Sequence, residues 1–187
     1  MTLTRLDQNT ALIVVDLQKG IADMAGADLI APVVERSVAL IHAFRRHDLP
    51  VVLVNVAGSA SGRTEVGRPM GKPPEGFIEL LPELGQQPGD IAVTKYSWGA
   101  FATTDLEARL KALDMTQVVV AGVATGTGVE ATARQAYEAG FNVALAIDAM
   151  ADMRAEAHAY SIKNVFPRLG ETATSGEIIE KLENRDD

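Results

Sequence analysis

The sequence predicts an α/β fold with three layers, in which a doubly wound parallel sheet of six strands is covered by helices on both faces. Short, β-branched apolar runs recur along the chain, and they lack the alternation that is typical of half-exposed strands. Helical patterns separate these runs, and such alternation favours parallel strands joined by right-handed crossovers. No repeat or long linker interrupts the chain, so we expect one domain over residues 1–187.

The first half of the chain supplies three of the expected strands and one long helix. The strands are expected at residues 11–16, 51–56 and 91–95, and the helix at residues 32–46. Residues 21–29 show no clear pattern, and a short helix is expected within 78–84. The stretch from Ala57 to Pro74 is rich in Gly, Ser, Pro and mixed charge, which is typical of a functional or mobile loop.

The second half supplies the other three strands, each followed or preceded by a helix. The strands are expected at residues 118–121, 142–148 and 171–174, and the helices at 104–113, 128–140, 156–166 and 175–183. A turn with three glycines joins the strand at 118–121 to its helix. Such a turn exposes backbone N–H groups beside the positive end of a helix dipole, so we expect the functional site there.

The composition excludes several classes of function. The net charge of −8 gives no support to a nucleic-acid partner. The absence of cysteine excludes disulfides, thiolate metal sites and a cysteine nucleophile. The chain shows neither a signal-peptide pattern nor an apolar run of membrane-spanning length, so we expect a cytoplasmic protein without a membrane partner.

Polar side chains at the ends of the expected strands are the candidates for chemistry, because ligands of parallel sheets bind beyond the carboxyl ends of the strands. Asp16 follows an apolar run, where desolvation would raise its pKa toward general acid or base use. A structural capping role is the alternative for this residue. Lys95 ends the third strand, where it could lower that pKa or hold an anionic group, or instead be a solvated lysine.

The glycine-rich turn allows two interpretations. In the first, the N–H groups near Ala124 and Gly128 form an oxyanion hole at a helix N-terminus. In the second, residues 126–131 match the dinucleotide fingerprint G-x-G-x-x-A, with Asp148 as the ribose-binding acid. Three residues separate Gly122 from the first fingerprint glycine, which argues against nucleotide binding.

Side chains near this turn offer few other catalytic groups. Thr125 and Thr127 could act as hydroxyl nucleophiles, but no histidine accompanies them in the sequence. The three histidines are expected on the surface or in the core; they are His42, His47 and His158. No ligand cluster with metal-binding spacing is present, so no metal is expected. Aromatic side chains after Lys95, including Trp98 and Phe101, would line a pocket or plug the top of the sheet.

Three separated motifs resemble the isochorismatase-like (cysteine hydrolase) superfamily. They are ALIVVDLQ at residues 11–18, KYSWGAF at 95–101 and GVATGTGVEATARQAYEAGF at 122–141. The resemblance implies a Rossmann-like, six-stranded parallel sheet and a cis peptide bond between Val123 and Ala124. Most members of this superfamily use an Asp-Lys-Cys triad. Asp16 and Lys95 match its first two positions, and Gly128 occupies the position of the cysteine.

Because it lacks this cysteine, the sequence resembles the branch of the superfamily that cleaves a vinyl ether without a covalent nucleophile. That branch implies that Asp16 protonates the substrate, that Lys95 tunes Asp16, and that no cofactor is needed. The resemblance also implies a homo-oligomer, either a dimer or a tetramer. The residues expected to contact a small anionic substrate are Gln18, Trp98, Phe101, Thr125 and Thr127. Loop cations could contact its carboxylate; they are Arg63, Arg68 and Lys72. A catalytically silent fold that binds a ligand or partner is the alternative.

Overall fold

A parallel sheet of six strands forms the centre of the protein. The computed structural model describes residues 3–66 and 71–185, and its strands lie in the order β3-β2-β1-β4-β5-β6. All five strand pairings are parallel, which confirms the predicted α/β class. The strands are β1 Thr10–Val15, β2 Val51–Val56, β3 Ile91–Lys95, β4 Gln117–Val123, β5 Asn142–Ala151 and β6 Glu171–Ala173.

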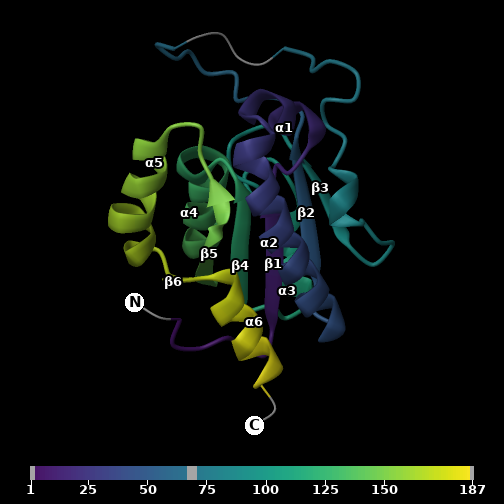
Figure 1. The fold of residues 1–187 in the computed structure, drawn as a ribbon, viewed down its shortest axis with the longest axis vertical. Helices are drawn as coiled ribbons and strands as arrows, with labels where there is room; N and C mark the ends of the chain where they lie inside the picture. The colour runs from purple at the N-terminus through teal and green to yellow at the C-terminus, as the bar shows by residue number, and fades with distance from the viewer. Residues whose placement is uncertain (1–2, 67–70, 186–187) are drawn as a thin grey trace.

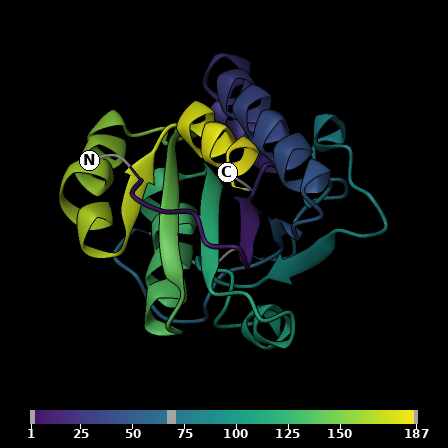
Figure 2. The ribbon, with the colours of Figure 1, turned by 90° about the horizontal axis from the view of Figure 1, so that it is seen from below.

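Helices cover both faces of the sheet, as predicted (Figures 1 and 2). One face carries α1 Lys19–Ala25, α2 Ala27–Arg46 and α6 Ser175–Glu183, and the other carries α3 Leu106–Ala112, α4 Glu130–Glu138 and α5 Ala155–Tyr160. The short helical turns are η1 Pro82–Leu84, η2 Thr125–Val129, η3 Ser161–Val165 and η4 Phe166–Arg168. None of the helices in the described part of the chain combines the length and apolar character that crossing a bilayer requires.

The burial of the central strands explains why their sequences lack polar alternation. Every residue of β1 and β4 is buried. Along β1, Leu12 and Val14 pack into the core beneath α2, while Ile13 and Val15 pack into the core on the opposite face. A strand with two covered faces needs apolar side chains at every position, so its sequence reads as a continuous run.

Two local expectations were wrong. Residues 21–29, predicted as irregular, are helical in α1 and in the first turn of α2, and Gly26 separates the two helices with φ of 87°. A left-handed break at glycine divides one helical segment into two short patterns, which hides the periodicity. The expected strand at 142–148 continues to Ala151, and its pairing with β4 shifts register between Val120 and Gly122.

Gly122 lets β1 and β4 approach closely at the carboxyl edge of the sheet. Its φ is 110°, and a Cβ atom there would lie 2.1 Å from the carbonyl oxygen of Val15. Val15 immediately precedes Asp16, and the strand order changes direction between β1 and β4. This close approach therefore shapes the crevice in which parallel sheets bind ligands.

Replacing Gly122 with alanine should destabilise the protein by about 3 kcal/mol or more, because overpacking against backbone adds to the cost of a left-handed φ. Urea unfolding measures this free energy. Gly89→Ala is the matched control, since nothing lies within 4 Å of a Cβ at that position, and its effect should stay within about 0.5 kcal/mol. Equal stabilities of the two variants would contradict the close approach.

Candidate active site

A buried ion pair between Asp16 and Lys95 forms the centre of the candidate site. Lys95 Nζ lies 2.8 Å from Asp16 Oδ2, and the two side chains are only 1% and 8% exposed. The pair spans β2, because Asp16 follows β1 and Lys95 ends β3. Lys95 Nζ also donates to the carbonyl oxygen of Ser97 at 3.1 Å. The sequence predicted both residues at strand ends, and the parallel sheet brings them together.

Asp16 combines an unusual backbone with an unusual proton affinity. Its φ is 54°, a left-handed conformation that aspartate tolerates better than most residues. Burial raises the pKa of its carboxyl from 3.8 to about 6, while the charge and hydrogen bond of Lys95 act in the opposite direction. Asp16 Oδ1 is buried and has no hydrogen-bond partner among the described residues. The carboxyl group therefore has one oxygen bound to Lys95 and one that can carry or accept a proton.

The glycine-rich turn places Gly128 directly against this carboxyl group. A Cβ atom at Gly128 would lie 3.0 Å from Asp16 Oδ2 and 3.1 Å from the carbonyl oxygen of Val123. The peptide bond between Val123 and Ala124 is cis, as the resemblance implied. The turn forms η2, in which Thr127 and Val129 both donate their N–H groups to the Ala124 carbonyl oxygen at 3.1 Å. Gly128 thus offers backbone, and no side chain, to the space beside Asp16.

The segment after β5 binds this turn through hydrogen bonds that the sequence did not predict. Thr125 Oγ1 lies 2.8 Å from His158 Nδ1, so a histidine that is distant in the sequence contacts Thr125 in the fold. The N–H of Gly126 donates to Asp152 Oδ2 at 2.8 Å. Thr125 is fully buried, so we interpret its contact with His158 as a means of holding the turn in place. No sequence motif could have revealed these contacts, because each joins residues 26 or more positions apart.

The other predicted contact residues have different positions. Gln18 is buried, and its side-chain amide exchanges hydrogen bonds with the backbone of Val56 and donates to the Phe77 carbonyl. Phe101 is 7% exposed and packs in the core against Phe141. Trp98, by contrast, is 64% exposed. The structure therefore gives Gln18 and Phe101 structural contacts and leaves Trp98 accessible.

Thr127 and Asp148 form hydrogen bonds with groups other than the charged pair. Thr127 Oγ1 donates to the carbonyl oxygen of Ala124 at 3.5 Å. Asp148 lies within β5 rather than at its end, and accepts hydrogen bonds from the N–H and hydroxyl of Ser175 at 2.6 and 2.8 Å. Asp148 is thereby committed to the start of α6 and is not the strand-end acid that the dinucleotide interpretation required.

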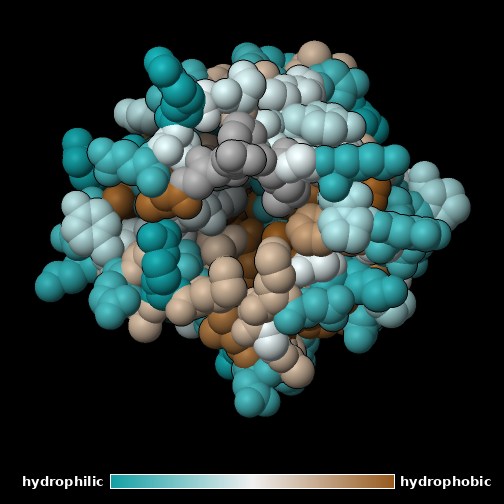
Figure 3. All heavy atoms as spheres, turned by 90° about the horizontal axis from the view of Figure 1, so that it is seen from above, coloured by the Kyte–Doolittle hydropathy of each residue, from teal (hydrophilic) through white to brown (hydrophobic). Residues whose placement is uncertain are grey.

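The carboxyl edge of the sheet is hollowed. Seen from above, the surface has a central recess lined by apolar atoms (Figure 3). A cavity of about 810 Å³ adjoins the ends of β2 and β3, where Ala57, Ile78, Lys72 and Tyr96 contribute to its wall. Arg63 is exposed on the loop, and Arg68 lies outside the described residues. Lys72 is thus the one predicted loop cation that lines this described cavity.

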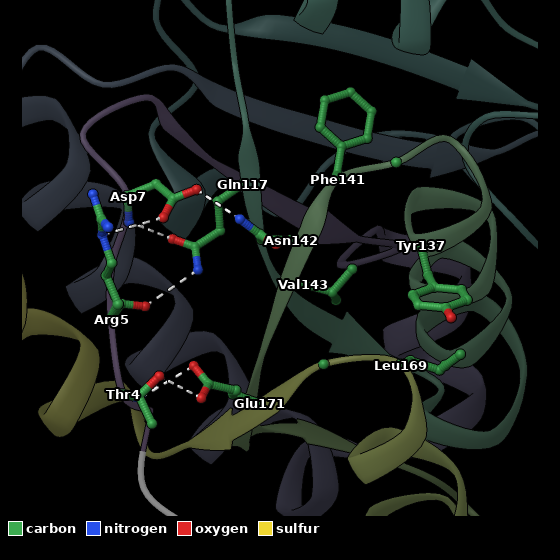
Figure 4. Close-up of a pocket in the computed structure, with 12 residues that line it drawn as sticks. Thr4, Arg5, Asp7, Gln117, Tyr137, Phe141, Asn142, Val143, Leu169 and Glu171 are labelled. Atoms are coloured by element: carbon green, nitrogen blue, oxygen red, sulfur yellow. Dashed lines mark hydrogen bonds and ion pairs between the residues drawn. The ribbon is translucent and has the colours of Figure 1, made fainter.

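A second cavity, of about 560 Å³, lies near the amino ends of β4 and β5 (Figure 4). Its polar side chains bind one another: Thr4 donates to the carboxylate of Glu171, and Asp7 accepts from Asn142. These contacts connect the N-terminal segment to the sheet. They occupy the groups that a ligand would need, so the carboxyl edge remains the better candidate site.

Metal binding has no support from the arrangement of side chains. Within residues 3–66 and 71–185, no three His, Asp or Glu side chains cluster as metal ligands would. The expectation that the protein acts without a metal or cofactor stays a prediction.

Removing Lys95 should raise the pKa of Asp16 above 6, because the ammonium group is the main influence that lowers it. We expect this shift in Lys95→Met, measured from the carboxyl carbon resonance of Asp16 during an NMR pH titration.

In the unchanged protein, the native state holds the Asp16 proton between pH 4 and 6 more tightly than the unfolded chain does. The Asp16 contribution to stability should therefore fall as pH rises through that window. A pKa near 3.8 in either protein would contradict the burial argument.

The contact between Thr125 and His158 should couple the two residues energetically. His158→Phe leaves the buried Thr125 hydroxyl without a partner, which should cost about 1–3 kcal/mol of unfolding free energy. Adding Thr125→Val should recover part of that loss, because both polar groups are then absent. Tyr160→Phe, an exposed change near the end of the same helix, is the control and should be neutral. Additive effects of the two mutations would show that the contact contributes nothing.

Comparisons with known proteins agree with this geometry. The sequence matches the isochorismatase domain family over residues 10–177. It is 37% identical to the isochorismatase family protein YwoC of Bacillus subtilis over 182 residues, covering 94% of this chain and 95% of the relative. It is 38% identical to the isochorismatase family protein YecD of Escherichia coli O157:H7, covering 94% and 97%.

A solved structure shows the same architecture over nearly the whole chain. An isochorismatase family protein from Burkholderia thailandensis superposes with a TM-score of 0.87 at 33% identity, covering 97% of this chain and all of that one. The family match, the two relatives and the architecture of the parallel sheet agree. The chain therefore belongs to the isochorismatase family.

Proposed function

We propose that the protein is a hydrolase that acts without a covalent nucleophile on a small anionic substrate with a vinyl ether or a related C–O or C–N bond. The observation that carries this proposal is the buried Asp16 carboxyl, with a pKa of about 6, facing a glycine at position 128. A carboxyl with a pKa of about 6 is protonated in about one molecule in ten at pH 7, far more often than an ordinary aspartate, and so can act as a general acid.

The proposed reaction on a vinyl ether begins with proton transfer. Asp16 donates its proton to the terminal carbon of the double bond, and the electron pair of that bond forms the new C–H bond. Water adds to the resulting oxocarbenium carbon and returns a proton to Asp16. The hemiketal then collapses with cleavage of the C–O bond, which releases an alcohol and a ketone.

Lys95 has two roles in this proposal. Its ammonium group stabilises the Asp16 carboxylate after proton transfer, because the two atoms lie 2.8 Å apart in a buried setting. Its positive charge also favours a substrate that carries a carboxylate. Gly128 packs closely against Asp16 and presents no side chain to it, and this absence of an enzyme nucleophile supports attack by water.

A second candidate function is ligand or partner binding without turnover. The observation that favours it is the burial of the pair, since Asp16 and Lys95 are almost inaccessible in this structure. Saturable binding of small anions without product formation would support this alternative.

Isochorismate is the first substrate to test, with release of pyruvate as the measurement. Asp16→Asn cannot donate the required proton and should reduce turnover by at least about a hundredfold. Asp105→Asn is the matched control, since its carboxylate is 75% exposed, and it should keep full activity. Gly128→Ala should also lose activity, because the new Cβ would crowd Asp16 Oδ2 at 3.0 Å. Pyruvate release that survives Asp16→Asn would exclude this mechanism.

A further inference from the structure

α2 has an apolar surface on part of its outer side, in addition to the side that packs on the sheet. Ile30, Val33, Leu40 and Phe44 are buried against the core. A separate groove of about 710 Å³ runs along the outer side and is bounded by α1, α2 and the segment at η1. Its apolar wall consists of Ala22, Ala27, Ile30, Ala31, Val34, Val38 and Leu81. The fold therefore leaves one apolar groove beside a helix whose other side already forms the core.

The groove has the shape of a binding site for a helix. Its α2 positions, 27, 31, 34 and 38, recur at the spacing of one helical face. At 1.5 Å per residue they cover about 16 Å, or roughly three helical turns. Val34, Val38 and Leu81 pack against the core beneath them, so the groove has a firm floor. Amphipathic helices bind such grooves through apolar residues at i, i+3 or i+4, and i+7.

The charges around the groove specify what could occupy it. Asp23, Glu35 and Glu83 line the groove, and no lysine or arginine does. None of these three carboxylates has an ion-pair partner within the described ranges. Neighbouring cations are engaged elsewhere, since Lys19 pairs with Glu79 and Arg36 pairs with Asp148. An occupant with positive charge on both sides of an apolar face would cover the apolar wall of the groove and pair with the three carboxylates around it.

We propose that this groove binds a positively charged amphipathic helix of another protein. A two-fold contact with a second copy of the chain would place one acidic rim against the other, which like-charge repulsion disfavours. An anionic membrane surface is disfavoured for the same reason. Figure 3 shows apolar atoms gathered at the lower edge of the view, which is the face turned toward the viewer in Figure 1, where α2 lies in front of the sheet. This proposal does not depend on the proposed reaction.

A synthetic helical peptide tests the proposal. The probe is a fluorescent peptide of about 18 residues with leucines at i, i+4, i+7 and i+11 and lysines on both flanks, and its binding to the full chain is followed by fluorescence anisotropy. We expect saturable binding that weakens at least about tenfold in the exposed double variant Glu35→Lys/Glu83→Lys. Ala31→Lys, which fills the groove with a long charged side chain, should weaken binding by a similar factor.

Matched controls separate this site from non-specific attraction to an acidic protein. Glu138→Lys reverses an exposed charge on α4 and should change the affinity less than twofold. A peptide of the same composition with its leucines spread around the helix should bind at least about tenfold more weakly.

Three results would overturn the proposal. They are equal binding of the rearranged peptide, equal weakening by Glu138→Lys, and a dimer in sedimentation velocity that Ala31→Lys dissociates. The dimer result would show that a second copy covers the groove.

Discussion

The buried contact between Asp16 and Lys95 constrains the rest of the site. Two charges removed from water are costly to bury unless each meets the other at close range, and here Nζ and Oδ2 are 2.8 Å apart. That distance requires the ends of β1 and β3 to be held in fixed register across β2. The continuous parallel pairing supplies this register, and Gln18 fastens the end of β1 to the end of β2 through hydrogen bonds with Val56.

Glycine at two positions determines what stands opposite this pair. Gly122 allows β4 to approach the backbone of Val15, and Gly128 brings the following turn against the Asp16 carboxyl without a side chain between them. The turn is held from the other side by Asp152 and His158. The site is thus built from a charged pair on one side and a backbone turn on the other. The proposed reaction, proton transfer followed by attack of water, rests on that division.

The groove beside α2 belongs to a different part of the surface from the catalytic candidate. It arises because part of the outer side of α2, beside α1 and η1, carries apolar side chains that the core covers only in part. The acidic side chains around the groove would repel those of a second copy, which disfavours contact between two copies of the chain at this surface. A binding surface for a basic helix and a site for a small anion can therefore coexist, since the cation at the candidate site is Lys95 and the groove has only carboxylates.

The sequence by itself determined the sheet, its helical layers and the position of Asp16 and Lys95 at the carboxyl ends of their strands; the strand order of the structure then brought the two side chains into contact. Buried strands require continuous apolar runs, and parallel strands place their carboxyl ends at one edge. Only the tertiary structure decided that Asp148 binds Ser175 at the start of α6, and that His158 and Asp152 hold the glycine-rich turn. Those contacts join β5 to the start of α6, and the glycine-rich turn to α5 and the segment before it. Such contacts leave no periodic signal in the sequence, because they join residues that are distant along the chain and meet only in the folded structure.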